Sequence, residues 1–182
     1  MSVLLVVSDK NGTGKTSLCA GLVNLLTING KRAGVFKPFV PDPSDYDNIH
    51  YKQLLNQVVD LKPELVPSNG LTQAILNNVR QTVDSLAKEN DVTIIEGTCG
   101  LTQNDTVALA NTLNADVLVI TGYKRALSAV EISSFRKDFE DRLKGVIING
   151  ITQYLGTEAE MNLIPKFTSE NITLLGLVPE NR

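Results

Sequence analysis

Short apolar runs rich in β-branched residues alternate along the chain with longer segments in which apolar and polar positions are mixed. The runs are residues 2–7, 33–36, 92–95, 117–121, 146–148 and 173–178. Continuous apolar runs of this length are typical of strands buried on both faces of a parallel sheet. We therefore expect these segments to be the strands of a mostly parallel sheet.

The mixed segments between the runs predict helices. They are residues 15–28, 47–59, 71–88, 106–113, 127–141 and 157–167. Strands that alternate with helices throughout predict an α/β fold, in which helices flank the sheet. The chain shows no internal repeat, linker or low-complexity stretch. Residues 1–182 are therefore expected to form a single domain.

Two segments carry more detailed expectations. The first expected helix should stop at Asn29-Gly30, a good helix terminator. One of its sides carries Leu18, Leu22, Leu25 and Leu26, and Cys19 is expected to lie in the core. Residues 62–70 contain two prolines and are expected to form a loop.

Composition narrows the class of protein. The chain has 182 residues, 42% of them hydrophobic and 20% charged, and a formal net charge of −3. These values are ordinary for a globular protein and give no reason to expect nucleic acid or a membrane as partner. The apolar start lacks a basic leader and a cleavage site, so it predicts a strand and not a signal peptide. Cys19 and Cys99 are far apart and have no partners at metal-ligand spacing, so we expect the cytoplasm.

The strongest motif lies between the first expected strand and the first expected helix. It is Lys10-Asn11-Gly12-Thr13-Gly14-Lys15-Thr16. In this position glycines let the backbone approach an anion closely, and N–H groups at the helix N-terminus face a phosphate. The fold is thus expected to be of the P-loop NTPase type, with ATP and Mg²⁺ as cofactors. The expected nucleotide-binding residues are Asn11, Gly12, Thr13, Gly14, Lys15, Thr16 and Ser17.

The two lysines of this phosphate loop have different expected roles. Lys15 is expected to reach the β- and γ-phosphates, and the Thr16 hydroxyl to ligate magnesium. The common form of the loop has glycine where Asp9 stands. The sequence fits better the variant in which a second lysine, here Lys10, precedes the glycines. Lys10 is therefore a candidate catalytic residue, with a solvated loop lysine as an equally weighted alternative.

Further short motifs follow in order along the chain. They are Val35-Phe36-Lys37-Pro38, Ile94-Ile95-Glu96-Gly97, Gly145-Val146-Ile147-Ile148-Asn149 and the segment from Leu175 to Glu180. In this order and spacing the chain resembles dethiobiotin synthetase and its relatives. Those relatives include the ATP-binding domain of cobyrinic acid amidases and the dethiobiotin-synthetase-like N-terminal domain of some phosphate acetyltransferases. The resemblance covers nearly the whole chain, and the last of these domains is the most similar.

The resemblance implies roles for residues outside the phosphate loop. Lys37 would contact the γ-phosphate and the acyl-type group of the substrate; the alternative is an exposed charge at a strand tip. Asn149 would read the purine, since its amide both donates and accepts hydrogen bonds; the alternative is a turn residue. Pro179, Glu180 and Asn181 would close the base pocket. A constitutive homodimer is also implied.

Acidic residues near the phosphate loop are candidates for the metal. Glu96 ends a buried strand at the sheet edge where ligands bind, and it could hold magnesium directly or through water. The alternative is an acidic residue at a surface-exposed strand end. Asp47 opens an expected helix and is the candidate for a second acidic contact, although it also fits a helix N-cap. Asp42 and Asp45 compete for the same role.

Three functions fit these residues. The first is an ATPase or ligase-like enzyme that activates a small carboxylate or a carbamate by phosphoryl transfer, with Lys15, Lys37 and Lys10 stabilising the transferred group. The second is a regulatory domain that senses nucleotide with little turnover. The third is a switch ATPase that dimerises around ATP. An aspartate-rich motif after the second strand would favour this switch, but Lys37-Pro38 stands there instead.

Overall fold

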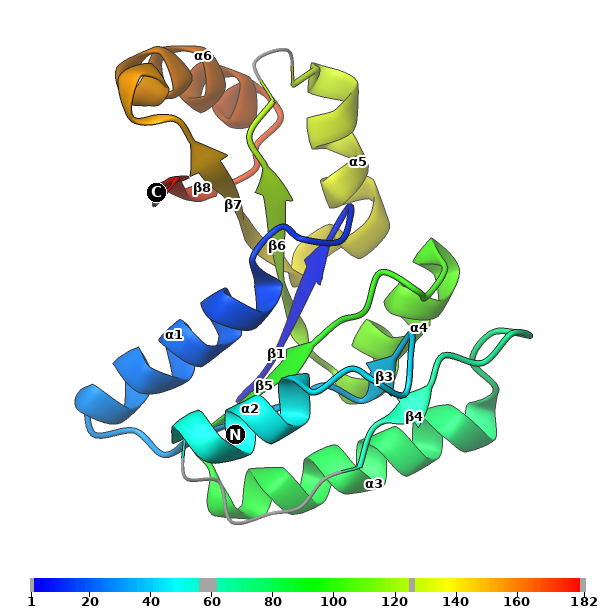
Figure 1. Cartoon of the computed structure of the whole chain (residues 1–182). Coiled ribbons are helices and arrows are strands. Elements are labelled where there is room, and N and C mark those ends of the chain that lie inside the picture. The colour runs from blue at the N-terminus through cyan, green and yellow to red at the C-terminus, as the bar shows by residue number, and fades with distance from the viewer. Residues whose placement is uncertain (1, 56–61, 125–126, 181–182) are drawn as a thin grey trace.

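A six-stranded sheet runs through the molecule (Figure 1). The computed structural model describes residues 2–55, 62–124 and 127–180. The strands are β1 (Ser2–Ser8), β2 (Ala33–Phe36), β5 (Val92–Glu96), β6 (Asp116–Gly122), β7 (Leu143–Ile151) and β8 (Leu174–Pro179). Their order across the sheet is β2-β5-β1-β6-β7-β8, and every neighbouring pair is parallel. The expected α/β fold with a parallel sheet is confirmed.

Helices cover both faces of this sheet (Figure 1). One face is covered by α1 (Lys15–Ile28), with α2 (Asp47–Leu55) beside it. The other face is covered by α3 (Gln73–Glu89), α4 (Gln103–Leu113), α5 (Ala129–Phe139) and α6 (Gly156–Ser169). The short strands β3 (Phe39–Val40) and β4 (Glu64–Leu65) form a separate parallel pair. No helix in the described ranges is long and apolar enough to cross a membrane.

The side chains of β1 alternate between two hydrophobic cores. Leu5 and Val7 pack into the core beneath α3 to α6, whereas Val6 packs with Cys19 and Val23 of α1. Burial of one such side chain contributes about 1.5–3 kcal/mol, and here it does so on both faces. Because both faces are buried, the sequence of β1 is a continuous apolar run. The packing on both faces fixes the end of β1 beneath the loop that follows.

Most of the expected elements are present, with boundaries set by caps. The fourth expected helix starts at Gln103 and not at residue 106, because the Thr102 side chain accepts a hydrogen bond from the Asp105 backbone N–H. The fifth is shorter than residues 127–141, because a capping box of Ser128 and Glu131 starts it at Ala129. The second is described only as far as Leu55; the rest of its expected range falls at residues 56–59, outside the described residues.

The helix α1 contacts the core largely as expected, whereas the expectation of a loop at residues 62–70 was wrong. Cys19 is buried as expected, together with Val23. Leu18, Leu22 and Leu26 are partly buried and pack against the same core, and only Leu25 of this group, which is 56% exposed, faces solvent. The expected loop at residues 62–70 contains β4, whose backbone pairs with β3 directly after Lys37-Pro38. A two-residue strand has no periodicity, so the pattern of the sequence could not indicate it.

Candidate functional site

The loop between β1 and α1 is shaped to receive an anion. Gly12 and Gly14 adopt positive φ angles of 72° and 90°. The Leu18 N–H donates to the Gly14 carbonyl at 2.9 Å and begins the helix, and no side chain caps its N-terminus. The Thr13 hydroxyl is buried without a hydrogen-bond partner. Uncapped backbone N–H groups and a free buried hydroxyl are donors that suit phosphate oxygens.

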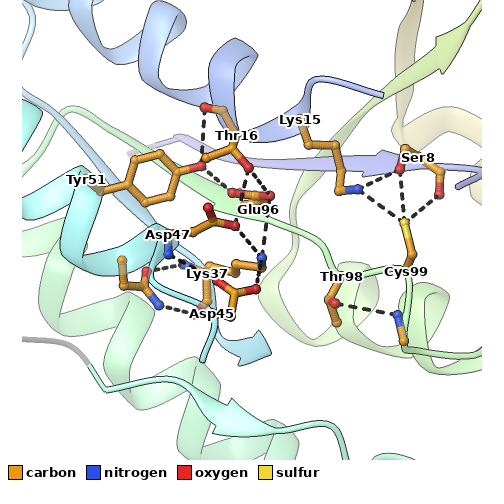
Figure 2. Close-up of polar contacts among 12 residues, drawn as sticks. Ser8, Lys15, Thr16, Lys37, Asp45, Asp47, Tyr51, Glu96, Thr98 and Cys99 are labelled. Carbon is orange, nitrogen blue, oxygen red and sulfur yellow. Dashed lines mark hydrogen bonds and ion pairs between the residues drawn. The ribbon is translucent and has the colours of Figure 1, made fainter. Parts of the chain in front are cut away.

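Lys15, the first residue of α1, is almost fully buried with its ammonium held by two neighbours. Its Nζ donates to Ser8 Oγ at 2.7 Å and lies 3.2 Å from Cys99 Sγ (Figure 2). Ser8 ends β1, and Cys99 lies in the loop after β5. The cation is therefore held at the carboxyl edge of the sheet by a hydroxyl and a sulfur atom, with no carboxylate among these two contacts, and lies beside the loop that would receive an anionic ligand.

Three oxygen-bearing side chains meet beside the loop, as Figure 2 shows. Thr16 Oγ1 lies 3.0 Å from Glu96 Oε1 and 3.3 Å from Asp47 Oδ2. They come from α1, from the end of β5 and from the start of α2. The structure thus brings together the residues expected to bind magnesium.

Lys37 adds a buried cation to this cluster. Its Nζ lies 2.6 Å from Asp45 Oδ2, 2.5 Å from Asp47 Oδ2 and 3.9 Å from Glu96 Oε1. Burial lowers the pKa of Lys37, but the hydrogen bonds to the two aspartates outweigh it and raise the pKa above 10.5. The lysine is thus charged, and a charged group already occupies the centre of the acidic cluster. Lys37 is 6% exposed, so the alternative of an exposed charge is wrong.

A divalent cation fits these donors only in part. No group of three or more His, Cys, Asp or Glu side chains within the described ranges is arranged to hold a metal by itself. Magnesium, however, is held in nucleotide sites by one or two carboxylates together with phosphate oxygens and water. Thr16, Asp47 and Glu96 supply such a partial set. Two members of the set, Asp47 and Glu96, already lie beside a cation, the Lys37 ammonium.

Glu96 is held in place by a residue that the sequence did not indicate. The phenol of Tyr51 donates to Glu96 Oε2 and lies 3.4 Å from the Thr16 carbonyl. Burial raises the pKa of Glu96, and the hydrogen bond from Tyr51 and the charge of Lys37 oppose that rise. Tyr51 lies one helical turn after Asp47, which is the signal that could have linked the two. Glu96 is 2% exposed, so it is not an acidic residue of the surface.

Two cavities meet at the loop after β5. The first, with a volume of about 440 Å³, lies over the phosphate loop and is lined by residues 11–17, Lys37, Asp45, Asp47 and Glu96. The second, of about 330 Å³, extends between α4 and α5 and is lined on its polar side by Ser8, Asp9 and Asp138. Both share Gly97, Thr98 and Cys99 as a common wall.

Other residues expected to bind nucleotide lie at the ends of β7 and β8. Asn149 Nδ2 donates to the Thr13 carbonyl at 2.8 Å, which holds the end of β7 against the phosphate loop. Pro179 pairs in register with Ile151, just beyond Asn149, so the end of β8 lies beside β7. Glu180 follows there, its N–H donating to the Ile151 carbonyl. Asn181 lies outside the described residues.

Lys10 and Asp42 do not join the cluster. The end of the Lys10 side chain lies against Gly122, at the end of β6, and Lys10 is not among the described residues that line the cleft. Asp42 accepts hydrogen bonds from Ser44 in the turn before α2. Of the three aspartates considered for the metal, Asp47 contacts Thr16, and Asp45 contacts Lys37.

A family model described as an AAA domain matches residues 2–182. The chain belongs to this AAA domain family. The match spans nearly the whole chain and includes the phosphate loop that leads into α1. The chain is therefore a member of a P-loop, nucleotide-binding family.

Three relatives are similar to this chain at low identity. The cobyrinate a,c-diamide synthase of Listeria monocytogenes is 26% identical over 194 residues, covering 100% of the chain and 40% of the synthase. The ATP-dependent dethiobiotin synthetase of Caldicellulosiruptor saccharolyticus is 24% identical and covers 98% of the chain and 85% of the synthetase. A phosphate acetyltransferase of Nitrosomonas europaea is 25% identical, with 29% of its length covered. The resemblance drawn from the motifs is confirmed.

Solved structures agree on the fold. The MinC:MinD cell division complex of Aquifex aeolicus matches with a TM-score of 0.67 and 18% identity, covering 100% of this chain and 82% of that one. The 54 kDa signal recognition particle protein of Aeropyrum pernix, in complex with GDP, matches with a TM-score of 0.66 and 13% identity; it covers 99% of this chain and 42% of that one. At these identities the likeness concerns the fold, which is that of P-loop NTPases.

Proposed function

We propose that this chain binds ATP with magnesium and transfers the γ-phosphoryl group to a small carboxylate or carbamate. The observation that carries the proposal is the convergence of Lys15, Lys37 and the oxygens of Thr16, Asp47 and Glu96 on one cleft. Phosphoryl transfer needs positioning and positive charge more than covalent chemistry. The cleft offers both.

Each residue has a distinct part in the proposed reaction. The N–H groups of residues 12–16 and the Lys15 ammonium would bind the β- and γ-phosphates. Magnesium, when bound, would neutralise charge on the phosphate oxygens, with Thr16, Asp47 and Glu96 holding it. Lys37 would stabilise the phosphoryl group in transit. The acceptor oxygen forms a bond to the γ-phosphorus as the bond to ADP breaks.

The second cavity supports a place for the acceptor. It adjoins the phosphate cleft through the wall of residues 97–99. Its lining in the described chain includes Asp9 and Asp138 but no lysine or arginine, so it suits an amine better than an anion. An acceptor that carries an amine could bind there and present the carboxylate or carbamate to the phosphate cleft. A diamino acid with bicarbonate is therefore the probe of choice.

The test is ADP release from magnesium-ATP, with and without a diamino acid and bicarbonate. The proposal predicts stimulation in the wild type that is lost in Lys15→Ala and Lys37→Ala. Tight nucleotide binding without stimulation, and with turnover indifferent to Lys37, would contradict it and favour the nucleotide-sensing domain.

Sedimentation with and without ATP tests the proposed constitutive homodimer, since a dimer formed only with ATP would favour the switch ATPase. We place the protein in the cytoplasm as part of the same proposal.

A further inference from the structure

Tyr51 is the most deeply enclosed polar side chain next to the cleft. It is 1% exposed and lies in the core between α1 and the sheet, with Cys19 and Ile94 as neighbours. Its hydroxyl nevertheless donates a hydrogen bond to the carboxylate of Glu96 (Figure 2). If Tyr51 only filled space, phenylalanine would pack there equally well. A buried hydroxyl that makes a specific hydrogen bond indicates a further role.

The hydrogen bond from Tyr51 divides the two oxygens of Glu96 between different partners. Oε2 accepts from the phenol, inside the protein. Oε1 accepts from Thr16 and lies on the side of Lys37, within the cleft. A carboxylate fastened through one oxygen can rotate little, so the other oxygen keeps a fixed direction. That direction is toward the Thr16 hydroxyl.

The same helix supplies the second carboxylate. Asp47 and Tyr51 are four residues apart on α2 and so lie on one face of it. Asp47 Oδ2 contacts Thr16 Oγ1, and the Tyr51 hydroxyl lies 3.4 Å from the Thr16 carbonyl. One helix face therefore fixes the positions of Asp47, Glu96 and Thr16 relative to one another.

We infer that Tyr51 is a positioning residue for magnesium, which acts by fastening Glu96 so that a single oxygen faces the metal beside Thr16. The inference rests on the proposed function, since it concerns the magnesium of that site. Partners that orient a metal-binding carboxylate are worth about 10–100-fold in metal affinity. Tyr51 itself does not touch the metal or the nucleotide.

The test compares binding of the non-hydrolysable analogue AMPPNP in magnesium and in EDTA, by calorimetry. The dissociation constant in EDTA divided by the dissociation constant in magnesium measures how much the metal strengthens nucleotide binding. In Tyr51→Phe this ratio should fall by about ten-fold or more, while affinity in EDTA stays unchanged. Tyr46→Phe is the matched control, because Tyr46 lies just before the same helix and is 55% exposed. It should behave as the wild type.

A double-mutant cycle with Glu96→Gln separates positioning from folding. If Tyr51 acts through Glu96, adding Tyr51→Phe to Glu96→Gln should cause no further loss of metal coupling. Equal losses in both backgrounds, or an unchanged ratio in Tyr51→Phe alone, would overturn the inference while nucleotide binding stands. An AMPPNP affinity of the wild type that is indifferent to magnesium would instead remove the metal from the proposed function.

Discussion

At the scale of single residues, both buried lysines of the site have partners before any ligand arrives, but only Lys37 is paired with carboxylates. Lys37 is enclosed by Asp45 and Asp47, and Lys15 by Ser8 and Cys99. The sequence indicated Lys15 and Thr16 through a motif, and Glu96 through its place at a strand end. It gave no indication of Ser8, because a serine at a strand end carries no signal of its partner across the chain. For Tyr51 the only signal was its place one helical turn after Asp47, and that spacing does not reveal Glu96 as the partner.

Removing the charge of Lys37 should destabilise the protein. Lys37→Met leaves the buried Glu96 and the partly buried Asp45 and Asp47 without their cation, so we expect a loss of about 3 kcal/mol in the free energy of unfolding by urea. Lys144→Met is the control, since Lys144 pairs with Asp116 at 3.1 Å but is half exposed; its loss should stay below about 1 kcal/mol. Equal effects of the two changes would contradict the account of Lys37 as a buried counterion.

The two glycines of the phosphate loop should respond differently to alanine. Both have positive φ, so Gly12→Ala and Gly14→Ala should each cost about 1–2 kcal/mol of backbone strain. A Cβ at Gly14 would also lie 2.5 Å from Asn149 Nδ2, whereas one at Gly12 meets nothing within 4 Å. Urea unfolding should therefore show a larger loss for Gly14→Ala. The same loss for both would mean that Asn149 does not hold the loop.

At the scale of elements, the sequence predicted the strands and helices well because buried parallel strands are apolar throughout. The boundaries moved where local caps act, as at Thr102 and Ser128. On α1 only Leu25 departs from expectation, since it faces solvent while Leu18, Leu22 and Leu26 pack partly buried beside Cys19 and Val23. The smaller Cys19 and Val23 are the side chains that pack closest to the sheet.

The capping box of α5 should give the protein a measurable acid dependence. Hydrogen bonds from the Ser128 backbone and side chain, and from Lys124, lower the pKa of Glu131 to about 2. The ordinary value is 4.5, so this contribution to stability is present above pH 4.5 and is lost as the pH falls toward 2. Thermal unfolding between pH 2 and 5 should have a shallower pH dependence in Glu131→Gln. An identical slope would contradict this capping role.

At the scale of the whole molecule, the parallel sheet explains why distant motifs form one site. The carboxyl ends of β1, β2, β5 and β7 all lie at one edge, so the loops that carry Lys15, Lys37, Glu96 and Asn149 converge there. The order of the motifs along the chain was visible in the sequence. Their contacts depend on the strand order β2-β5-β1-β6-β7, which the sequence did not determine.

Calorimetric titration with magnesium-AMPPNP measures whether this cleft binds a nucleotide through Lys15. Truncating one partner of a buried, hydrogen-bonded charge pair costs about 2–5 kcal/mol of binding free energy. We therefore predict saturable binding of one nucleotide per chain, weakened about 100-fold in Lys15→Ala. Wild-type protein that binds no nucleotide, or a Lys15→Ala variant that binds as tightly as the wild type, would contradict the account.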